Sequence, residues 1–144
     1  MKNLETLTSS EKEMLLKFPI YISLLAANWD GKLNETEKKS AISFSHVKTY
    51  SCDPLLKEYY HEADKVFEKN IIKVDNELPK GKDERDAAIK IELAKLENIL
   101  LKLDKNYAKT MRRSMETFKD HVSRAYRNAL ETFLLPISIK GLTD

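Results

Sequence analysis

The sequence has few of the residues that form turns, disulfides or membrane spans. Its 144 residues include only three glycines and four prolines, too few turn formers for a β-sandwich or β-barrel. The single cysteine, Cys52, has no partner for an internal disulfide, which favours a reducing compartment. The longest apolar run, residues 18–27, is too short to cross a bilayer, and the first residues lack an apolar signal segment. We therefore expect a cytoplasmic protein without a membrane span.

An excess of charge of one sign is also missing. Lys and Arg number 25 and Asp and Glu 23, so the net charge is only +2. A net charge this small creates no strong electrostatic field that would attract nucleic acid or an anionic membrane. The basic residues between positions 109 and 127 are interrupted by Glu116 and Asp120, a mixture typical of a solvated helix. We expect no specific nucleic-acid partner.

What the sequence does contain is helix-forming residues at helical spacing. Apolar residues make up 42% of the chain and charged residues 33%, which is ordinary for a folded helical protein. Leu, Lys, Glu and Ala dominate, and all four favour helices. We predict an all-α fold, a compact bundle of about five helices in a single domain over residues 1–144.

The first predicted helix begins at a capping box and contains a proline. Thr8 and Glu11 form the box, and the helix is predicted from about Ser10 to about Trp29. Pro19 removes one backbone donor and crowds the carbonyl four residues earlier, so the helix should kink at Phe18 or split into two. Beyond Pro19 apolar residues surround the axis, which predicts a buried central helix.

Two further helices are predicted between residues 34 and 75. Asn34 and Glu37 repeat the capping pattern and start a helix that fades near Tyr50. Asp53 and Pro54 then open a third helix with one apolar face. That face consists of Leu56, Tyr59, Tyr60, Ala63, Phe67, Ile71 and Val74. Residues 75–82, DNELPKGK, are predicted to form a loop.

The last part of the chain carries two apolar stripes at steps of three and four residues. The fourth predicted helix has Ile89, Leu93, Leu96, Leu100 and Leu103, and the fifth has Met111, Met115, Phe118, Val122, Ala125 and Ala129. Residues 104–106 between them contain neither Gly nor Pro. One unbroken helix over residues 84–134 would be roughly 75 Å long. We favour a helical hairpin, because short connections are common between antiparallel helices.

The segment AANWDGKLNETE, residues 26–37, has the spacing of an EF-hand calcium loop if Gly31 occupies the invariant glycine position. Oxygen donors then fall at Asn28, Asp30, Asn34 and Glu37. These four residues are the predicted ligands of a divalent cation, with Ca, Mg, Mn and Zn not distinguished. Ala26 stands where the first carboxylate of such a loop belongs. The alternative is a plain connection, in which Asp30 and Gly31 end one helix and Asn34 and Glu37 cap the next.

The same segment resembles the first motif of the TerB-like family, which is named for a tellurite-resistance protein. The resemblance covers mainly residues 10–50, and the matching motif residues are Asp30, Gly31, Leu33 and Glu37. It implies a compact all-helical cytoplasmic domain linked to stress responses. It also implies that the acidic residues of the Asp-Gly motif hold a divalent cation.

No catalytic constellation is evident. Glu58 and His61 have the spacing used in di-iron bundles, but a single copy is insufficient and a solvated surface pair is the better interpretation. Neither His46 nor His121 has a nucleophilic partner at a recognisable spacing. We predict no catalytic residue, no organic cofactor and a non-enzymatic role.

The alternative function is a metal-free interaction module. In this interpretation the fourth and fifth helices contact a protein partner or form a homo-oligomer. Met111 and Met115 fit such a pliable surface, although an ordinary core is the role that we favour for them.

Overall fold

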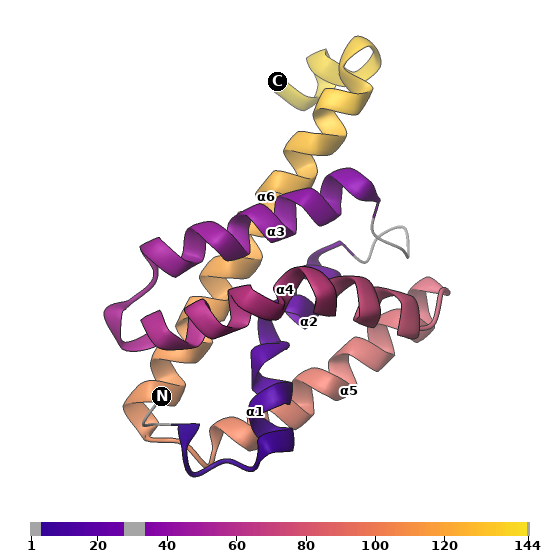
Figure 1. Ribbon diagram of the computed structural model, residues 1–144. Coiled ribbons are helices and arrows are strands. Elements are labelled where there is room, and N and C mark those ends of the chain that lie inside the picture. The colour runs from indigo at the N-terminus through magenta and orange to yellow at the C-terminus, as the bar shows by residue number, and fades with distance from the viewer. Residues whose placement is uncertain (1–3, 28–33, 144) are drawn as a thin grey trace.

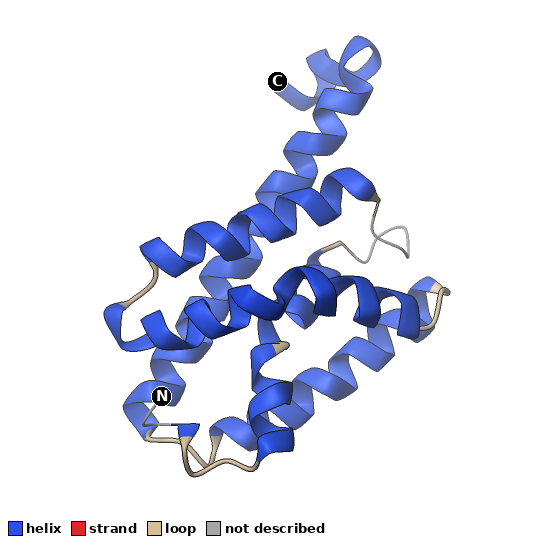
Figure 2. Cartoon of the chain, viewed as in Figure 1, coloured by secondary structure: helices blue, strands red, loops and turns tan. Residues whose placement is uncertain are grey.

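The computed structural model describes residues 4–27 and 34–143, and in these residues it contains helices and no strand (Figures 1 and 2). The predicted all-α fold is confirmed. The elements in chain order are α1 (Ser9–Leu16), α2 (Phe18–Ala26), α3 (Glu35–Ser51), the short 3-10 helix η2 (Pro54–Leu56), α4 (Lys57–Glu77), α5 (Lys82–Leu100) and α6 (Lys105–Thr143).

The first predicted helix is split in two at Lys17. The Thr8 and Glu11 capping box is present at the start of α1, with hydrogen bonds of 2.9 and 3.1 Å. Pro19 has no N–H to donate to the Leu15 carbonyl four residues earlier. The Tyr59 hydroxyl of α4 donates to that carbonyl instead, at 2.6 Å. A side chain from another helix thus stabilises the break that the proline causes.

The second half of the split helix, α2, lies at the centre of the fold, as predicted. Residues 18–24 are all buried, and α2 packs against α4, α5 and α6. In Figure 1 the other helices surround it. A helix that is apolar on every side can be stable only in such a position.

Next to α2, α3 and α4 pack side by side (Figure 1). All seven residues of the apolar face predicted for the third helix are buried. The loop predicted over residues 75–82 is shorter than expected, since α4 continues to Glu77 and α5 begins at Lys82. Asp75 therefore lies inside a helix, where Arg85 of α5 pairs with it.

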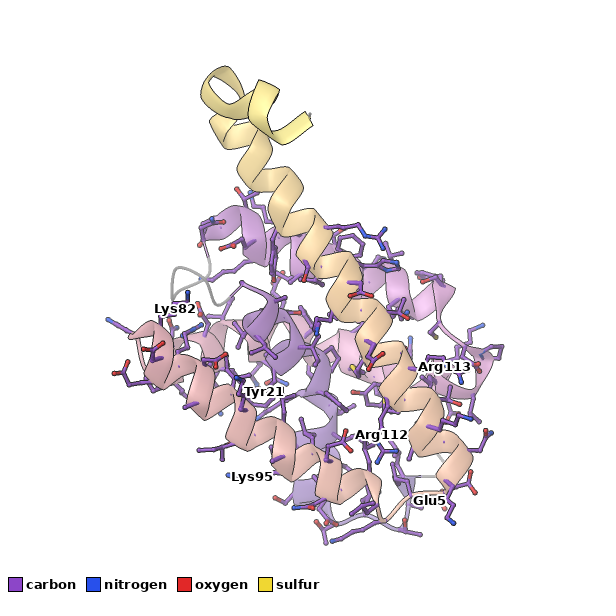
Figure 3. All side chains as sticks on the ribbon, turned by 180° about the vertical axis from the view of Figure 1, so that it is seen from behind. Glu5, Tyr21, Lys82, Lys95, Arg112 and Arg113 are labelled. Atoms are coloured by element: carbon purple, nitrogen blue, oxygen red, sulfur yellow. The ribbon has the colours of Figure 1, made fainter. Side chains whose placement is uncertain are left out.

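The predicted hairpin is also present, with its turn slightly earlier than the sequence indicated. α5 ends at Leu100, and the Asp104 carboxylate accepts the N–H groups of Asn106 and Tyr107 at 3.1 and 3.2 Å, which starts α6. The two helices diverge from this turn, and both pack against α2 (Figure 3). The last part of α6 extends beyond the other helices (Figure 1).

The described helices share one hydrophobic core. Met111 and Met115 are buried in it, which confirms their core role. Of the helices in residues 4–27 and 34–143, none has an apolar stretch long enough to cross a membrane.

Candidate functional site

Two of the four predicted ligands, Asn34 and Glu37, lie at the start of α3. The Asn34 side-chain oxygen accepts the Glu37 N–H at 2.8 Å, and a Glu37 carboxylate oxygen accepts the Asn34 N–H at 2.9 Å. These bonds form the predicted capping box. The other two predicted ligands, Asn28 and Asp30, lie in residues 28–33, outside the described residues. The structure thus brings Asn34 and Glu37 together through their backbone amides.

Burial distinguishes Glu37 from the other acidic residue in the first turn of α3. Glu37 is 2% exposed, whereas the side chain of Glu35 is 83% exposed. Taking a carboxylate out of water is costly unless hydrogen bonds or cations compensate it. α3 therefore holds one carboxylate inside the protein, at the position where the connection from α2 reaches the helix.

A second buried carboxylate, Asp75, links three helices. Its Oδ1 atom forms an ion pair with Arg85 of α5, and its Oδ2 atom lies 3.8 Å from Lys38 Nζ of α3. The side chains of Asp75 and Arg85 are 0% and 1% exposed. Arg85 Nη1 also donates to the Asp75 carbonyl at 3.2 Å, which joins the end of α4 to the start of α5. This pairing was not predicted from the sequence.

The phenol of Tyr126 is buried against α2, and the charges of both carboxylates act on it. The hydroxyl of this α6 residue donates to the Ser23 carbonyl of α2 at 3.3 Å. Burial raises the pKa of Tyr126, and the negative charges of Glu37 and Asp75 raise it further. Both carboxylates therefore lie within electrostatic range of the same phenol. We call Glu37, Lys38, Asp75, Arg85 and Tyr126 the junction cluster.

The junction cluster has oxygen donors suited to a hard cation, together with two cations of its own. Asp75 Oδ2 is buried and has no hydrogen-bond partner in the described part of the chain, so it could accept a ligand. Among the side chains that the structure describes, no three from His, Cys, Asp or Glu converge as a ligand set. Donors from residues 28–33 would be needed to complete a site.

Ser45, His46 and Asp64 resemble a catalytic triad, but their hydrogen bonds differ from those of a triad. Asp64 of α4 accepts the Ser45 hydroxyl at 3.0 Å and lies 3.1 Å from His46 Nδ1. Nucleophilic catalysis needs the hydroxyl bonded to the imidazole, whereas here both side chains bond to the carboxylate. The group holds α3 against α4.

The other residues considered from the sequence also have ordinary environments. Glu58 and His61 are both exposed, as predicted for a surface pair. Cys52 ends α3 and is partly buried, and burial raises the pKa of its thiol, which disfavours the reactive thiolate.

Comparison of the chain with protein-family models, curated proteins and solved structures gave no match.

Proposed function

We propose that this chain is a non-enzymatic helical domain of the TerB-like kind that binds a divalent cation between residues 28 and 37. One observation supports it above the others. The carboxylate at the closing position of the predicted loop, Glu37, is buried rather than solvated, and a second buried carboxylate, Asp75, acts on the same phenol. Exposed capping residues are common, whereas a buried carboxylate at the closing position of a predicted ion loop offers an oxygen ligand shielded from water.

The chemistry of the donors is consistent with a hard cation. Glu37, Asp75 and the Asp30 and Asn28 side chains of the connection offer only oxygen, the ligand that Mg, Ca and Mn prefer. Arg85 and Lys38 already neutralise Asp75 in part, so the ion would be held mainly by Asp30 and Glu37. Glu37 can take part while one of its oxygens still accepts the Asn34 N–H.

Replacing Glu37 with glutamine is expected to weaken cation binding by more than about tenfold, since even partners behind the ligands of a metal site contribute tenfold or more. Glutamine keeps an oxygen that can accept the Asn34 N–H, so the change removes mainly the charge. Trp29, the single tryptophan, adjoins Asp30 in the sequence and reports binding by fluorescence during titration with Ca, Mg, Mn or Zn. The melting temperature should rise with the same ion.

Glu35→Gln is the matched control. It removes the same charge from the same helical turn at an exposed position, where Glu35 pairs with Lys38 at 3.7 Å, so it tests the loss of a first-turn charge without the loss of a buried carboxylate. Asp30→Asn should weaken binding as Glu37→Gln does. A flat titration to millimolar metal with folded protein would reject the proposal, as would an equal loss in the Glu35 variant.

A groove between α2, α5 and α6 favours a second candidate function, the metal-free interaction module. The groove has a volume of about 230 Å³, and its apolar lining comes from Phe18, Ile22, Leu25, Leu93 and Met115. Arg112, labelled in Figure 3, pairs with Glu97 at 2.9 Å on its lining. An apolar groove with a charged border is the usual form of a contact surface.

Light scattering at tens of micromolar separates this candidate from the first. If the groove mediates self-association, the wild type should have the mass of a dimer and Leu93→Glu that of a monomer, because a buried charge opposes association. A monomeric wild type would count against the homo-oligomer, and the groove could then serve only to bind a different protein.

A further inference from the structure

A second pocket lies between the carboxyl-terminal half of α3 and the middle of α6, away from the start of α3 where the junction cluster lies. Its volume is about 500 Å³, within the range of small-molecule sites. Phe44 and Val47 of α3 and Phe118 of α6 form its apolar walls. Val47 is 50% exposed, so the pocket opens to solvent. Phe44 and Val47 therefore line a pocket, and Phe44 also packs against the edge of the core.

The polar part of the pocket is cationic. Lys48 of α3 and His121 and Arg124 of α6 line it, and no acidic residue is among the described residues that do so. The His121 ring lies beside the Phe44 ring, with centroids 6.0 Å apart and planes tilted by 31°, so the imidazole lies at the apolar wall. Whichever nitrogen carries the proton, the ring keeps one N–H donor. Three potential donors to an anion thus surround one apolar space.

Lys48 is the most unusual of these residues because it is only 8% exposed. Its ammonium group lies 5.9 Å from the centre of the Tyr60 ring, and among the side chains that the structure describes it forms no ion pair with a carboxylate. Burial lowers the pKa of Lys48, because the surroundings penalise the charged form. Lysines are almost never buried to this extent without a partner. An anion in the pocket would supply the missing partner.

We propose that this pocket binds a small monocarboxylate with an apolar tail. The carboxylate would accept hydrogen bonds from Lys48, with His121 and Arg124 beside it, and the tail would lie against Phe44, Val47 and Phe118. The single buried ammonium group of Lys48 suits one negative charge, since Arg124 is exposed and His121 is half-buried. The apolar walls favour a ligand with a tail over a simple inorganic anion.

Titration with octanoate, followed by amide NMR spectra of the full chain, tests the proposal. Signals of residues 44–51 and 118–124 should shift, and Lys48→Met should weaken binding about tenfold or more, because it removes a charge-assisted hydrogen bond. Octanamide, which has the same tail without the charge, should bind the wild type about tenfold more weakly than octanoate. Acetate, which has the charge without the tail, should also bind weakly.

Lys39→Met is the matched control, since it removes a lysine of the same helix that does not line this pocket. Arg124→Gln is a second variant at an exposed position, and it should weaken octanoate binding several-fold even if Lys48→Met disturbs the fold. The proposal is overturned if octanoate shifts no signals in these segments, if octanamide binds as well as octanoate, or if the Lys39 variant loses as much affinity as the Lys48 variant.

Discussion

Replacing Arg85 with methionine is expected to lower the free energy of unfolding by about 3–5 kcal/mol. The change leaves the Asp75 carboxylate, whose side chain is 0% exposed, without its main cation. Lys38 lies 3.8 Å from the other carboxylate oxygen and is partly exposed, so it compensates only in part. The hydrogen bonds from Arg85 to the Asp75 and Pro79 carbonyls, which hold the connection between α4 and α5, are lost as well. Urea denaturation followed by circular dichroism measures the effect.

Two further variants test the cause of this loss. Arg112→Met removes an arginine from an ion pair with Glu97 in which both side chains are about half exposed, and it should cost no more than about 1 kcal/mol. The double variant Asp75→Leu with Arg85→Met removes both buried charges, and it should recover most of the stability. If the two single changes simply add in the double variant, the ion pair is not the source of the loss.

The helices, together with the starts of α1 and α3, could be predicted from the sequence because their signals are short-range. Asn34 and Glu37 are three residues apart, and this spacing alone indicates the capping box that the structure contains. Pro19 likewise indicates the break between α1 and α2. Such signals depend on the geometry of one helical turn and need no knowledge of the tertiary fold.

The spacing of apolar residues does not predict the Asp75–Arg85 pair, because both residues are charged. Asp75 lies four residues after Ile71, and Arg85 lies four residues before Ile89, so each charge continues a buried face. Opposite charges on the buried faces of two helices joined by a short connection were a usable signal. The sequence instead predicted a loop over residues 75–82, which placed Asp75 outside the helix, whereas α4 continues to Glu77.

The buried face of α3 could not be predicted from hydrophobicity. Its larger aliphatic and aromatic residues include Ile42, Phe44 and Val47, yet its buried positions include Ala41, Ser45 and Lys48. α3 packs on α4 and α6 through small and polar side chains, and the Ser45 hydroxyl is satisfied by Asp64 at 3.0 Å. Which face of α3 is buried depends on α4 and α6, which are distant in the sequence. With this face buried, Phe44 and Val47 line the pocket beside Lys48.

Replacing Tyr59 with phenylalanine is expected to lower the free energy of unfolding by about 1–3 kcal/mol. The Tyr59 hydroxyl donates to the Leu15 carbonyl at 2.6 Å in the protein interior. Pro19 cannot donate to that carbonyl, so the variant loses a hydrogen bond that water replaces poorly. Urea denaturation measures the change. Tyr50→Phe removes the same atom from a residue that is 77% exposed, and it should have almost no effect.

A cycle with Pro19→Ala separates the hydrogen bond from general packing. Alanine returns an N–H at the position four residues after Leu15, and the chain can then form the helical hydrogen bond that Tyr59 replaces. Pro19→Ala should therefore be more favourable in the Tyr59→Phe background than in the wild type, with a coupling energy of about 1 kcal/mol. Additive effects would mean that the carbonyl does not need Tyr59. Coupling would show that the Tyr59 hydroxyl of α4 takes the place of the helical N–H that Pro19 lacks, and so stabilises the break between α1 and α2.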